Sequence, residues 1–502
     1  MAAIITETFR RKMRDLLEQD MIANPYYIGI GKSNSWEPNS SGTVESSTTF
    51  NVPIPSGTPG DDLETLNNLT SLLKITEENI SAAIPNIAWK SGQSYKAYSP
   101  HDETCFYSDT NLIYPCYAIN TTIPQKPIFL CIQRGAGPST SPPTLSSYGI
   151  QVKPDGYAWV YIQNYINFDD TVNSSSFLQI NKQNLVESGA VSSTIASCKN
   201  TTGGKIYGFT VVHGGSGYSI ADPPICYISI RRTSTAPDSD PTTFESGFEL
   251  KPVVANVSLP GGVNILGAIT GWTFKDDTQN LLTLLNDPAN TEIISASVEI
   301  RPRAGTAGKD ALIVPHISPL NGFGYQPSKD FPGWYMGVYS KLEDDTEDTF
   351  FTPYRQISII RNPSWNPEMG LNAPATLRAL RYFTILQSVN IDSSIVGVPI
   401  RILYTASGIS DPVIGYADLI YNDLDNLDTK RLYFHQSYSS GFGHIPNTGK
   451  IYIGNMTTPI DYTAVSSDEY IMNTGEIVFT ENRKPISRAP QQAEELKIII
   501  QL

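Results

Sequence analysis

Short segments rich in aromatic and β-branched residues, separated by clusters of Gly, Pro and Ser, recur along most of this 502-residue chain. The clearest is 157–163, where three aromatic residues alternate with three aliphatic ones. Because successive side chains of a strand point to opposite faces, this pattern predicts a strand buried on both faces. The chain has 37 Gly, 36 Pro and 27 Tyr, and 17% of its residues are charged, against roughly 25% in a typical globular protein. This composition favours many short strands joined by turns.

Helices are expected mainly near the N-terminus. Apolar residues from Phe9 to Met21 recur at helical spacing, and Asn24-Pro25 should end that helix. A strand is predicted over 26–31. A second helical stretch is predicted over about 61–84, with a stripe of leucines and with Asp61 or Asp62 as its cap; the alternative is that Thr76 restarts it as a separate turn before Pro85.

The length indicates two to four domains, because one compact core rarely serves so many residues. We expect an N-terminal helix and β region over 1–185, an inserted β domain over 186–348, and a C-terminal β region over 349–502 that packs with the N-terminal region. A short helix at 277–286 and a helical turn opened by Pro374 are also predicted. The predicted fold class is mainly β, a multidomain antiparallel β-sandwich architecture with a few short helices near the N-terminus.

The net charge limits the classes of partner that this chain can bind, and its cysteines indicate the compartment in which it is made. The net charge is −14 and there is no basic tail, so we expect no nucleic-acid partner. No apolar run approaches the length of a membrane span, and no signal peptide is visible, so no membrane insertion is expected. The five cysteines show no C-x-x-C spacing, which favours buried free thiols in a protein made in a reducing cytosol. A disulfide between two of Cys105, Cys116 and Cys131 stays open.

Residues that could carry chemistry are sparse. The segment 29–33 (Gly-Ile-Gly-Lys-Ser) resembles the end of a phosphate-binding loop, but Tyr26 stands where that motif requires glycine. We therefore interpret it as a strand end whose lysine faces solvent or a partner. No two of the five histidines have the spacing of a helical zinc pair, and the acidic run 343–348 is interpreted as a solvated linker. We predict no catalytic, cofactor-binding or metal site and no enzyme activity, although a triad assembled in space cannot be read from sequence.

Several short motifs, in the same order along the chain, carry a family resemblance. They are Gly31-Lys32-Ser33 before Trp36, Ala83-Ile84-Pro85 before Trp89, Asp155-Gly156-Tyr157-Ala158-Trp159, Arg355 to Ile360 with Asn362-Pro363, Gly475-Glu476 with Glu481-Asn482-Arg483 and Pro485-Ile486, and Glu494-Glu495. With these motifs the chain resembles the baseplate wedge subunit encoded by tail gene eight of T-even-like contractile-tailed bacteriophages. The resemblance covers roughly 1–165, 354–365 and 470–502, and 186–345 has no counterpart.

The resemblance implies a structural role. Such subunits are mainly β, multidomain and dimeric, carry no cofactor and are not catalytic. They are virion proteins of the tail baseplate, assembled in the host cytoplasm, where they contact neighbouring wedge subunits and take part in the baseplate rearrangement on host contact. We therefore expect a homodimer that binds other baseplate wedge subunits. The structural or interface candidates are Lys32, Trp36, Trp89, Trp159, Arg355, Gln356, Glu481, Asn482 and Arg483.

Two other functions stay open. The aromatic and Gly-rich turns of 186–348 are compatible with a host-glycan (receptor) recognition module of a phage tail. A polysaccharide-cleaving tail enzyme would need paired carboxylates about 5–9.5 Å apart if hydrolytic, a spacing that the sequence cannot reveal.

Overall fold

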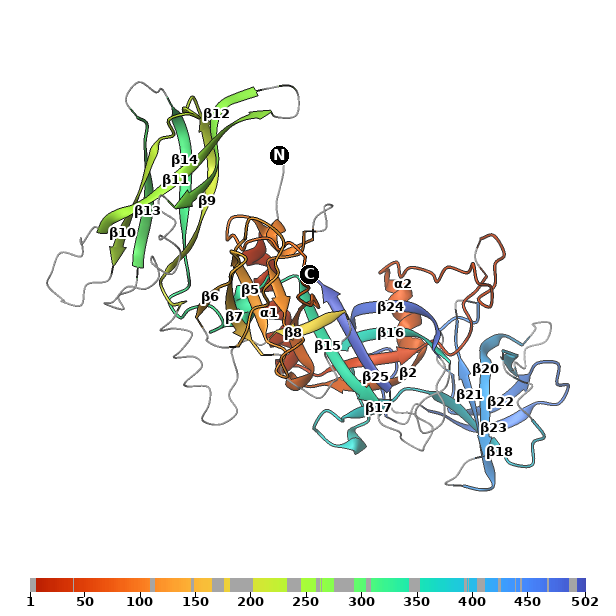
Figure 1. Ribbon diagram of the computed structural model, residues 1–502. Coiled ribbons are helices and arrows are strands. Elements are labelled where there is room, and N and C mark those ends of the chain that lie inside the picture. The colour runs from red at the N-terminus through yellow and green to blue at the C-terminus, as the bar shows by residue number, and fades with distance from the viewer. Residues whose placement is uncertain are drawn as a thin grey trace. The chain divides into compact units, whose positions relative to one another are not determined.

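The computed structural model shows a mainly β protein built from several antiparallel sheets (Figure 1), which confirms the predicted fold class. It describes residues 6–38, 40–108, 113–145, 149–164, 176–180, 202–232, 245–258, 262, 264–274, 293–303, 308–342, 353–391, 395, 397–403, 411–422, 426–437, 439–442, 445–466, 469–486 and 494–502. The predicted helix at 277–286, the acidic run 343–348 and the predicted domain boundaries after residues 185 and 348 lie outside these ranges.

The chain divides into two compact units, each assembled from separate stretches of sequence. The first unit comprises Met1–Arg14, Ser81–Met336 and Ile500–Leu502, and the second comprises Asp15–Ile80 and Gly337–Ile499. Both units therefore combine segments from the N-terminal and C-terminal parts of the sequence.

The first unit contains a four-stranded antiparallel sheet with the order β4-β5-β7-β6. Its strands are β4 (Tyr117–Ile119), β5 (Ile128–Gln133), β6 (Ile150–Val152) and β7 (Ala158–Gln163). The segment predicted as a strand buried on both faces is the central strand β7, and every one of its residues is buried. Its aromatic face packs into one core cluster and its aliphatic face into another. β8 (Phe177–Ile180) pairs with the end of β3 (Ile80–Pro85) in the same unit.

A two-layer β-sandwich forms the other part of the first unit (Figure 1). One layer has the order β12-β11-β10-β13 and the other is the antiparallel pair β14-β9. The strands are β9 (Ile206–Ser216), β10 (Ile225–Arg232), β11 (Glu245–Ser258), β12 (Asn264–Phe274), β13 (Ile293–Arg301) and β14 (Lys309–Ile317). Isoleucines from both layers, including Ile206, Ile228 and Ile313, bury one shared core. The first unit also contains the 3₁₀ turn η2 (Glu103–Phe106), which precedes β4, and the short helix α5 (Pro327–Asp330), which follows β14.

The second unit contains a five-stranded antiparallel sheet with the order β17-β2-β1-β16-β24. The strands are β1 (Tyr26–Gly31), β2 (Leu69–Ile75), β16 (Tyr354–Arg361), β17 (Thr376–Arg378) and β24 (Glu476–Ile486). β1 occupies the range predicted for it. The predicted helical stretch over 61–84 is wrong beyond Asn67, except that a separate turn does begin after Thr76, at Glu77–Asn79. The helix α2 (Pro59–Asn67) ends early, and Leu69, Leu72 and Leu73 lie in β2 between two other strands. A fully buried central strand carries a continuous apolar run, which mimics a helical stripe. The cap is Thr58, whose side chain accepts a hydrogen bond from the backbone of Asp61.

A closed barrel with the order β18-β21-β20-β19-β22-β23 follows in the second unit. Its strands are β18 (Arg381–Leu386), β19 (Pro399–Ile402), β20 (Val413–Asn422), β21 (Thr429–His435), β22 (Thr448–Ile453) and β23 (Ile460–Ser466). The helical turn predicted after Pro374 is not formed, because Thr376–Arg378 pairs with the edge of β2 as β17. The remaining elements are the 3₁₀ turns η1 (Glu77–Asn79) and η3 (Pro367–Met369) and the adjacent strands β15 (Tyr335–Leu342) and β25 (Glu494–Gln501).

The N-terminal helix α1 (Glu7–Ala23) ends directly before Asn24, as predicted, but it turns part of its apolar stripe outward. Phe9, Met13 and Leu16 are 53%, 45% and 58% exposed. The polar residues Arg14 and Glu18 on the opposite side are instead buried.

Specific polar contacts within the first unit explain this orientation. The guanidinium of Arg14 donates to the backbone oxygen of Ser328 at 3.4 Å, and the backbone N–H of Gly333 donates to the carboxylate of Glu7 at 2.5 Å. An added Cβ at Gly333 would lie 2.9 Å from the Cα of Arg11, so glycine permits the close approach of α1.

Candidate interaction surface

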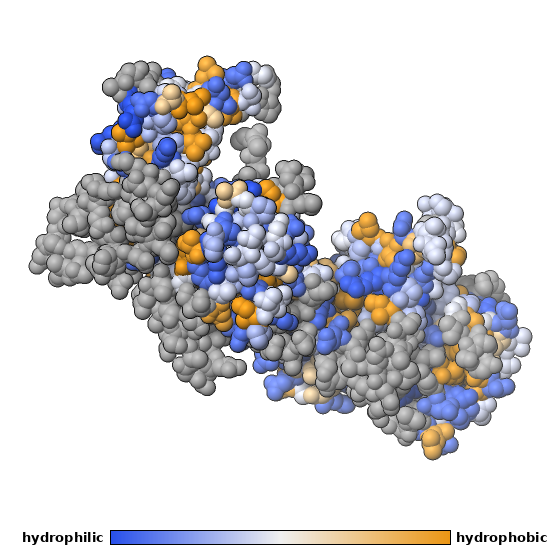
Figure 2. Space-filling model, viewed as in Figure 1, coloured by the Kyte–Doolittle hydropathy of each residue, from blue (hydrophilic) through white to orange (hydrophobic). Residues whose placement is uncertain are grey.

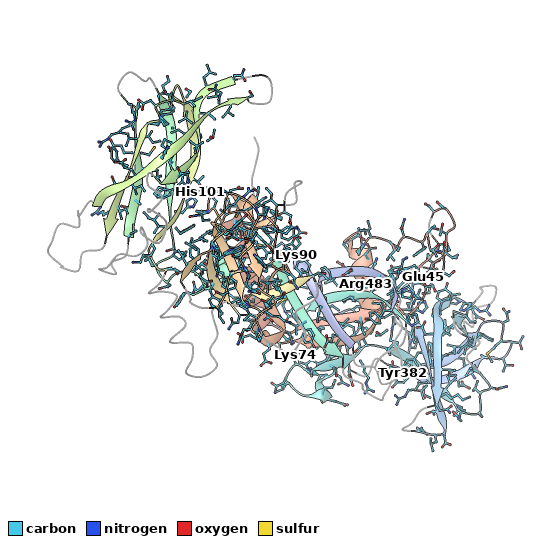
Figure 3. The ribbon with its side chains drawn as sticks, viewed as in Figure 1. Glu45, Lys74, Lys90, His101, Tyr382 and Arg483 are labelled. Atoms are coloured by element: carbon cyan, nitrogen blue, oxygen red, sulfur yellow. The ribbon has the colours of Figure 1, made fainter. Side chains whose placement is uncertain are left out.

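Seven of the nine predicted structural or interface residues gather at one end of the five-stranded sheet in the second unit. The pairing register places Gly31 beside Gln356, and Gln356 beside Asn482, so the end of β1, the first part of β16 and the second half of β24 lie side by side. We call this group the strand-end cluster, and Figure 3 marks its vicinity with the labels Arg483 and Glu45. Its members are Lys32, Trp36, Arg355, Gln356, Glu481, Asn482 and Arg483.

Lys32 turns the chain at the end of β1. Its φ of +61° is left-handed, and its backbone N–H donates to the oxygen of Asn68 at 3.0 Å. The ammonium group lies 2.9 Å from a carboxylate oxygen of Glu64 and 5.1 Å from the centroid of the Trp36 ring. Lys32 is only 5% exposed. The lysine therefore points to an internal carboxylate and an aromatic ring and not to solvent.

Arg355 forms a bidentate ion pair with Glu45. Its Nε and Nη2 donate to the two carboxylate oxygens at 2.5 and 2.8 Å, and Nη1 donates to the backbone oxygen of Ser33. Both side chains of the pair are at most 10% exposed. Burial by itself would raise the pKa of Glu45, but the hydrogen bonds and charge of Arg355 lower it below its usual value. Glu45 is therefore held ionised as a structural anchor.

Two further side chains, Trp36 and Asn482, fasten the long connection between β1 and α2 to the sheet, and Gln356 holds Asn482 in place. The indole N–H of Trp36 donates to the backbone oxygen of Arg483 at 2.9 Å, and the amide of Asn482 donates to the oxygen of Pro53 at 3.0 Å. The amide of Gln356 donates to the side chain of Asn482 at 2.8 Å. The cluster thus attaches an irregular segment to strands that lie hundreds of residues away in the sequence.

The outer part of the strand-end cluster faces solvent. Glu481 and Arg483 pair at 3.1 Å with side chains that are 41% and 39% exposed. A small cleft of about 260 Å³ lies beside them between β16, β24 and β25. Its lining residues are Tyr354, Ile357, Arg483, Ile486, Glu495, Leu496, Lys497 and Ile498.

The other two predicted residues, Trp89 and Trp159, belong to the first unit. Trp159 is fully buried in β7, and its ring lies 5.2 Å from that of Tyr95 in an edge-to-face contact. The indole N–H of Trp89 donates to the hydroxyl of Ser139 at 3.2 Å. The carboxylate of Asp155, in the same motif as Trp159, accepts hydrogen bonds from Ser139 and from three backbone N–H groups. These contacts are those of a structural turn.

Glu45 and Glu64 are ion-pair partners of the strand-end cluster that the sequence did not reveal. Glu45 lies in a Ser- and Thr-rich stretch, and Glu64 is one of several acidic residues on α2. Neither stands in a pattern that distinguishes it from a solvated carboxylate. Only the fold brings Glu45 to Arg355 and Glu64 to Lys32.

One Asp–His pair of the kind used in acid–base chemistry lies in the barrel. The ring nitrogen Nδ1 of His435 is 2.7 Å from a carboxylate oxygen of Asp418, and both side chains are nearly buried. The ring of Tyr416 stacks on the imidazole. Within the described ranges, no serine hydroxyl is hydrogen-bonded to this histidine, and no group of three or more His, Cys, Asp or Glu side chains is arranged to hold a metal ion.

Comparison with known proteins gives no family. No protein-family model matches the chain, and no curated protein has a significantly similar sequence. Among the described helices, none has the length and apolar character that crossing a membrane requires.

Proposed function

We propose that this chain is a structural component of a contractile phage tail baseplate wedge, located in the virion, that links neighbouring wedge subunits. The strand-end cluster carries the proposal. Three segments that resemble the wedge family, at 31–36, 355–356 and 481–483, lie far apart in the sequence and meet at one end of one sheet. Their contacts are ion pairs and hydrogen bonds that fix a shape. This supports a function performed by a preorganised surface.

The exposed apolar face of α1 supports self-association. Phe9 and Met13 are about half exposed on successive helical turns, and apolar residues gathered on one face of a helix commonly pack against a partner. In the proposal this face is the contact between two copies of the chain. The exposed Glu481–Arg483 pair and the adjacent cleft are then available to other wedge subunits.

The proposed mechanism is mechanical. The barrel and the sandwich each bury a core of their own, and tightly packed cores move as rigid bodies. Host contact would change which surfaces are paired while the cores keep their internal packing. Such a role requires neither a cofactor nor a reactive side chain.

Labelling of tail particles tests the proposal. Antibody raised against the full chain and detected with gold should decorate the baseplate of contractile-tailed particles produced from the genome that encodes it. A null allele should yield particles without complete baseplates, and a plasmid copy of the gene should restore them. Normal, infectious particles that lack the chain would refute the proposal.

Host-glycan recognition is the second candidate, favoured by apolar side chains displayed on the sandwich of the first unit. Figure 2 shows apolar residues on the visible face of this sandwich. Val212, Ile220, Leu266 and Leu312 are 41–64% exposed. However, Trp272 packs on Phe209 and donates its N–H to the Phe209 oxygen at 2.9 Å. Since sugar rings stack best on exposed aromatic faces, this candidate ranks second. Specific binding of the full chain on a glycan array, lost on truncating Leu266 and Leu312, would favour it.

A further inference from the structure

Two free thiols are in contact inside the first unit. The Sγ of Cys116 lies 3.6 Å from the Sγ of Cys105. The backbone N–H of Cys116 also donates to the oxygen of Cys105 at 2.8 Å. That backbone bond keeps the two Cα atoms within the separation that a disulfide spans. Rotation of the side chains can therefore bring the sulfurs to bonding distance without moving the backbone.

A third buried thiol lies close in the chain but is directed elsewhere. The backbone N–H of Cys131 donates to the oxygen of Cys116 at 2.6 Å. Its Sγ is instead directed at the backbone oxygen of Gln133 at 3.3 Å, and it packs in a different core cluster from the other two. Cys131 is therefore a matched control, equally buried and close in the sheet.

The two sulfurs in contact are chemically unequal. Cys105 accepts the S–H of Cys116, and this hydrogen bond lowers the pKa of the Cys105 thiol despite its burial. Burial and the same contact raise the pKa of the Cys116 thiol well above its usual value. The thiolate, the nucleophilic form of a cysteine, is thus favoured at Cys105.

We propose that Cys105 and Cys116 form a redox-responsive crosslink, in which a small two-electron oxidant of the peroxide class converts the thiol pair into a disulfide. The Cys105 thiolate attacks one peroxide oxygen, the O–O bond breaks, and water leaves after protonation of the departing hydroxide. The resulting sulfenic acid on Cys105 is then attacked by the sulfur of Cys116. The S–S bond forms, the S–O bond breaks and a second water leaves. Overall two thiols lose two electrons and two protons, and one peroxide is reduced to two waters.

The crosslink would stiffen a part of the core where several segments meet. Phe106, next to Cys105, packs edge-to-face against Trp334 and Tyr98. Tyr98 in turn stacks on Tyr207 of β9, at the start of the sandwich. The proposal does not depend on the baseplate function. A protein that is made in a reducing cytosol and later released from the cell would, however, pass into the oxidising conditions that form the crosslink.

Mass mapping of the intact chain tests the crosslink. The purified protein is incubated with hydrogen peroxide, denatured, alkylated and digested with trypsin. Trypsin does not cleave between Lys126 and Pro127, so Cys105, Cys116 and Cys131 all fall in one tryptic peptide, 97–134, within which fragmentation in the mass spectrometer distinguishes the three cysteines. We expect peptide 97–134 to become two hydrogens lighter and to be alkylated only at Cys131, and to regain alkylation at Cys105 and Cys116 after dithiothreitol. The thermal midpoint of the oxidised chain should rise by about 5 °C, because the closed loop restricts the unfolded state.

Two variants make the result decisive. C131S should form the crosslink as the natural chain does. C116S should form none, and Cys105 should instead accumulate sulfenic acid that reacts with dimedone. Persistence of alkylatable thiols at both Cys105 and Cys116 of the natural chain, under conditions that oxidise its other cysteines, would overturn the proposal without reference to any variant.

Discussion

Arg355 and Glu45, 310 residues apart in the sequence, are joined by two parallel hydrogen bonds of 2.5 and 2.8 Å at the end of the five-stranded sheet. A buried charge without its partner is costly, so Arg355→Met should destabilise the second unit by about 3–5 kcal/mol. The double variant R355M/E45M should lose less stability than the single variant R355M, because it leaves no unpaired carboxylate in the buried site. Urea unfolding followed by tyrosine and tryptophan fluorescence measures both values.

An exposed pair supplies the comparison for this experiment. Arg301 and Glu299 are 2.7 Å apart, and their side chains are 60% and 56% exposed. Water screens such a pair, so Arg301→Met should change stability by less than about 1 kcal/mol. Equal losses for R301M and R355M would contradict the structural role assigned to Glu45.

Asp330 should make the first unit more stable in mild acid. Burial raises the pKa of this carboxyl to about 7, although its hydrogen bond from the Gly324 N–H opposes the shift. The folded state therefore keeps a proton that the unfolded state releases above about pH 4. The resulting stabilisation is complete below pH 4 and is lost as pH rises to about 7, with a range of at most about 4 kcal/mol. Asp330→Asn should remove this dependence in denaturant titrations, while Asp428→Asn, at an exposed site, should leave it unchanged.

His316 should have the opposite effect on stability over a similar pH range: it should make the protein less stable in mild acid. Burial, and then the positive charge of His101, lower the pKa of His316 to about 4. As pH falls below about 6.5, His316 binds a proton in the unfolded chain but stays neutral in the folded chain. This difference in proton binding lowers the free energy of unfolding between about pH 6.5 and about pH 4, by up to roughly 3 kcal/mol.

Replacement of His316 by Phe isolates that contribution. Phe retains the contact with the ring of Tyr207, 5.4 Å away, and does not titrate. We expect H316F to be more acid-resistant than the natural chain in thermal unfolding between pH 6.5 and 4. The exposed His213 provides the control, and an equal gain for H213F would contradict the role assigned to burial.

Strand positions were predictable where local pattern and burial agree. β1 and β7 are rich in aromatic and β-branched residues and lie close to their predicted ranges. The helix predicted over 61–84 was wrong beyond Asn67, because a leucine run fits a buried central strand as well as a helical stripe. Only the neighbours of β2, on both sides of it in the sheet, decide between the two.

The strand-end cluster was predictable in part. Its seven residues belong to motifs that could be compared with a family, but Glu45 and Glu64 gave no signal, because their significance comes from partners supplied by the fold. The orientation of α1 was also hidden. Its apolar spacing was visible, yet the contacts of Glu7 and Arg14 with the segment 328–333 decide which face is covered.

The exposed face of α1 gives the most direct test of self-association. Phe9→Asp together with Met13→Asp places charges where two copies are proposed to meet, while the buried face of the helix keeps its contacts. If the full chain is a dimer, this double variant should weaken dimerisation by 100-fold or more, about 3 kcal/mol, with unchanged circular dichroism. Sedimentation velocity across a concentration series measures the change. Leu371→Asp removes an apolar residue that is 99% exposed elsewhere and should leave the dimer intact. A natural chain that sediments as a monomer at every concentration, or a double variant that remains dimeric, would show that α1 does not join two copies.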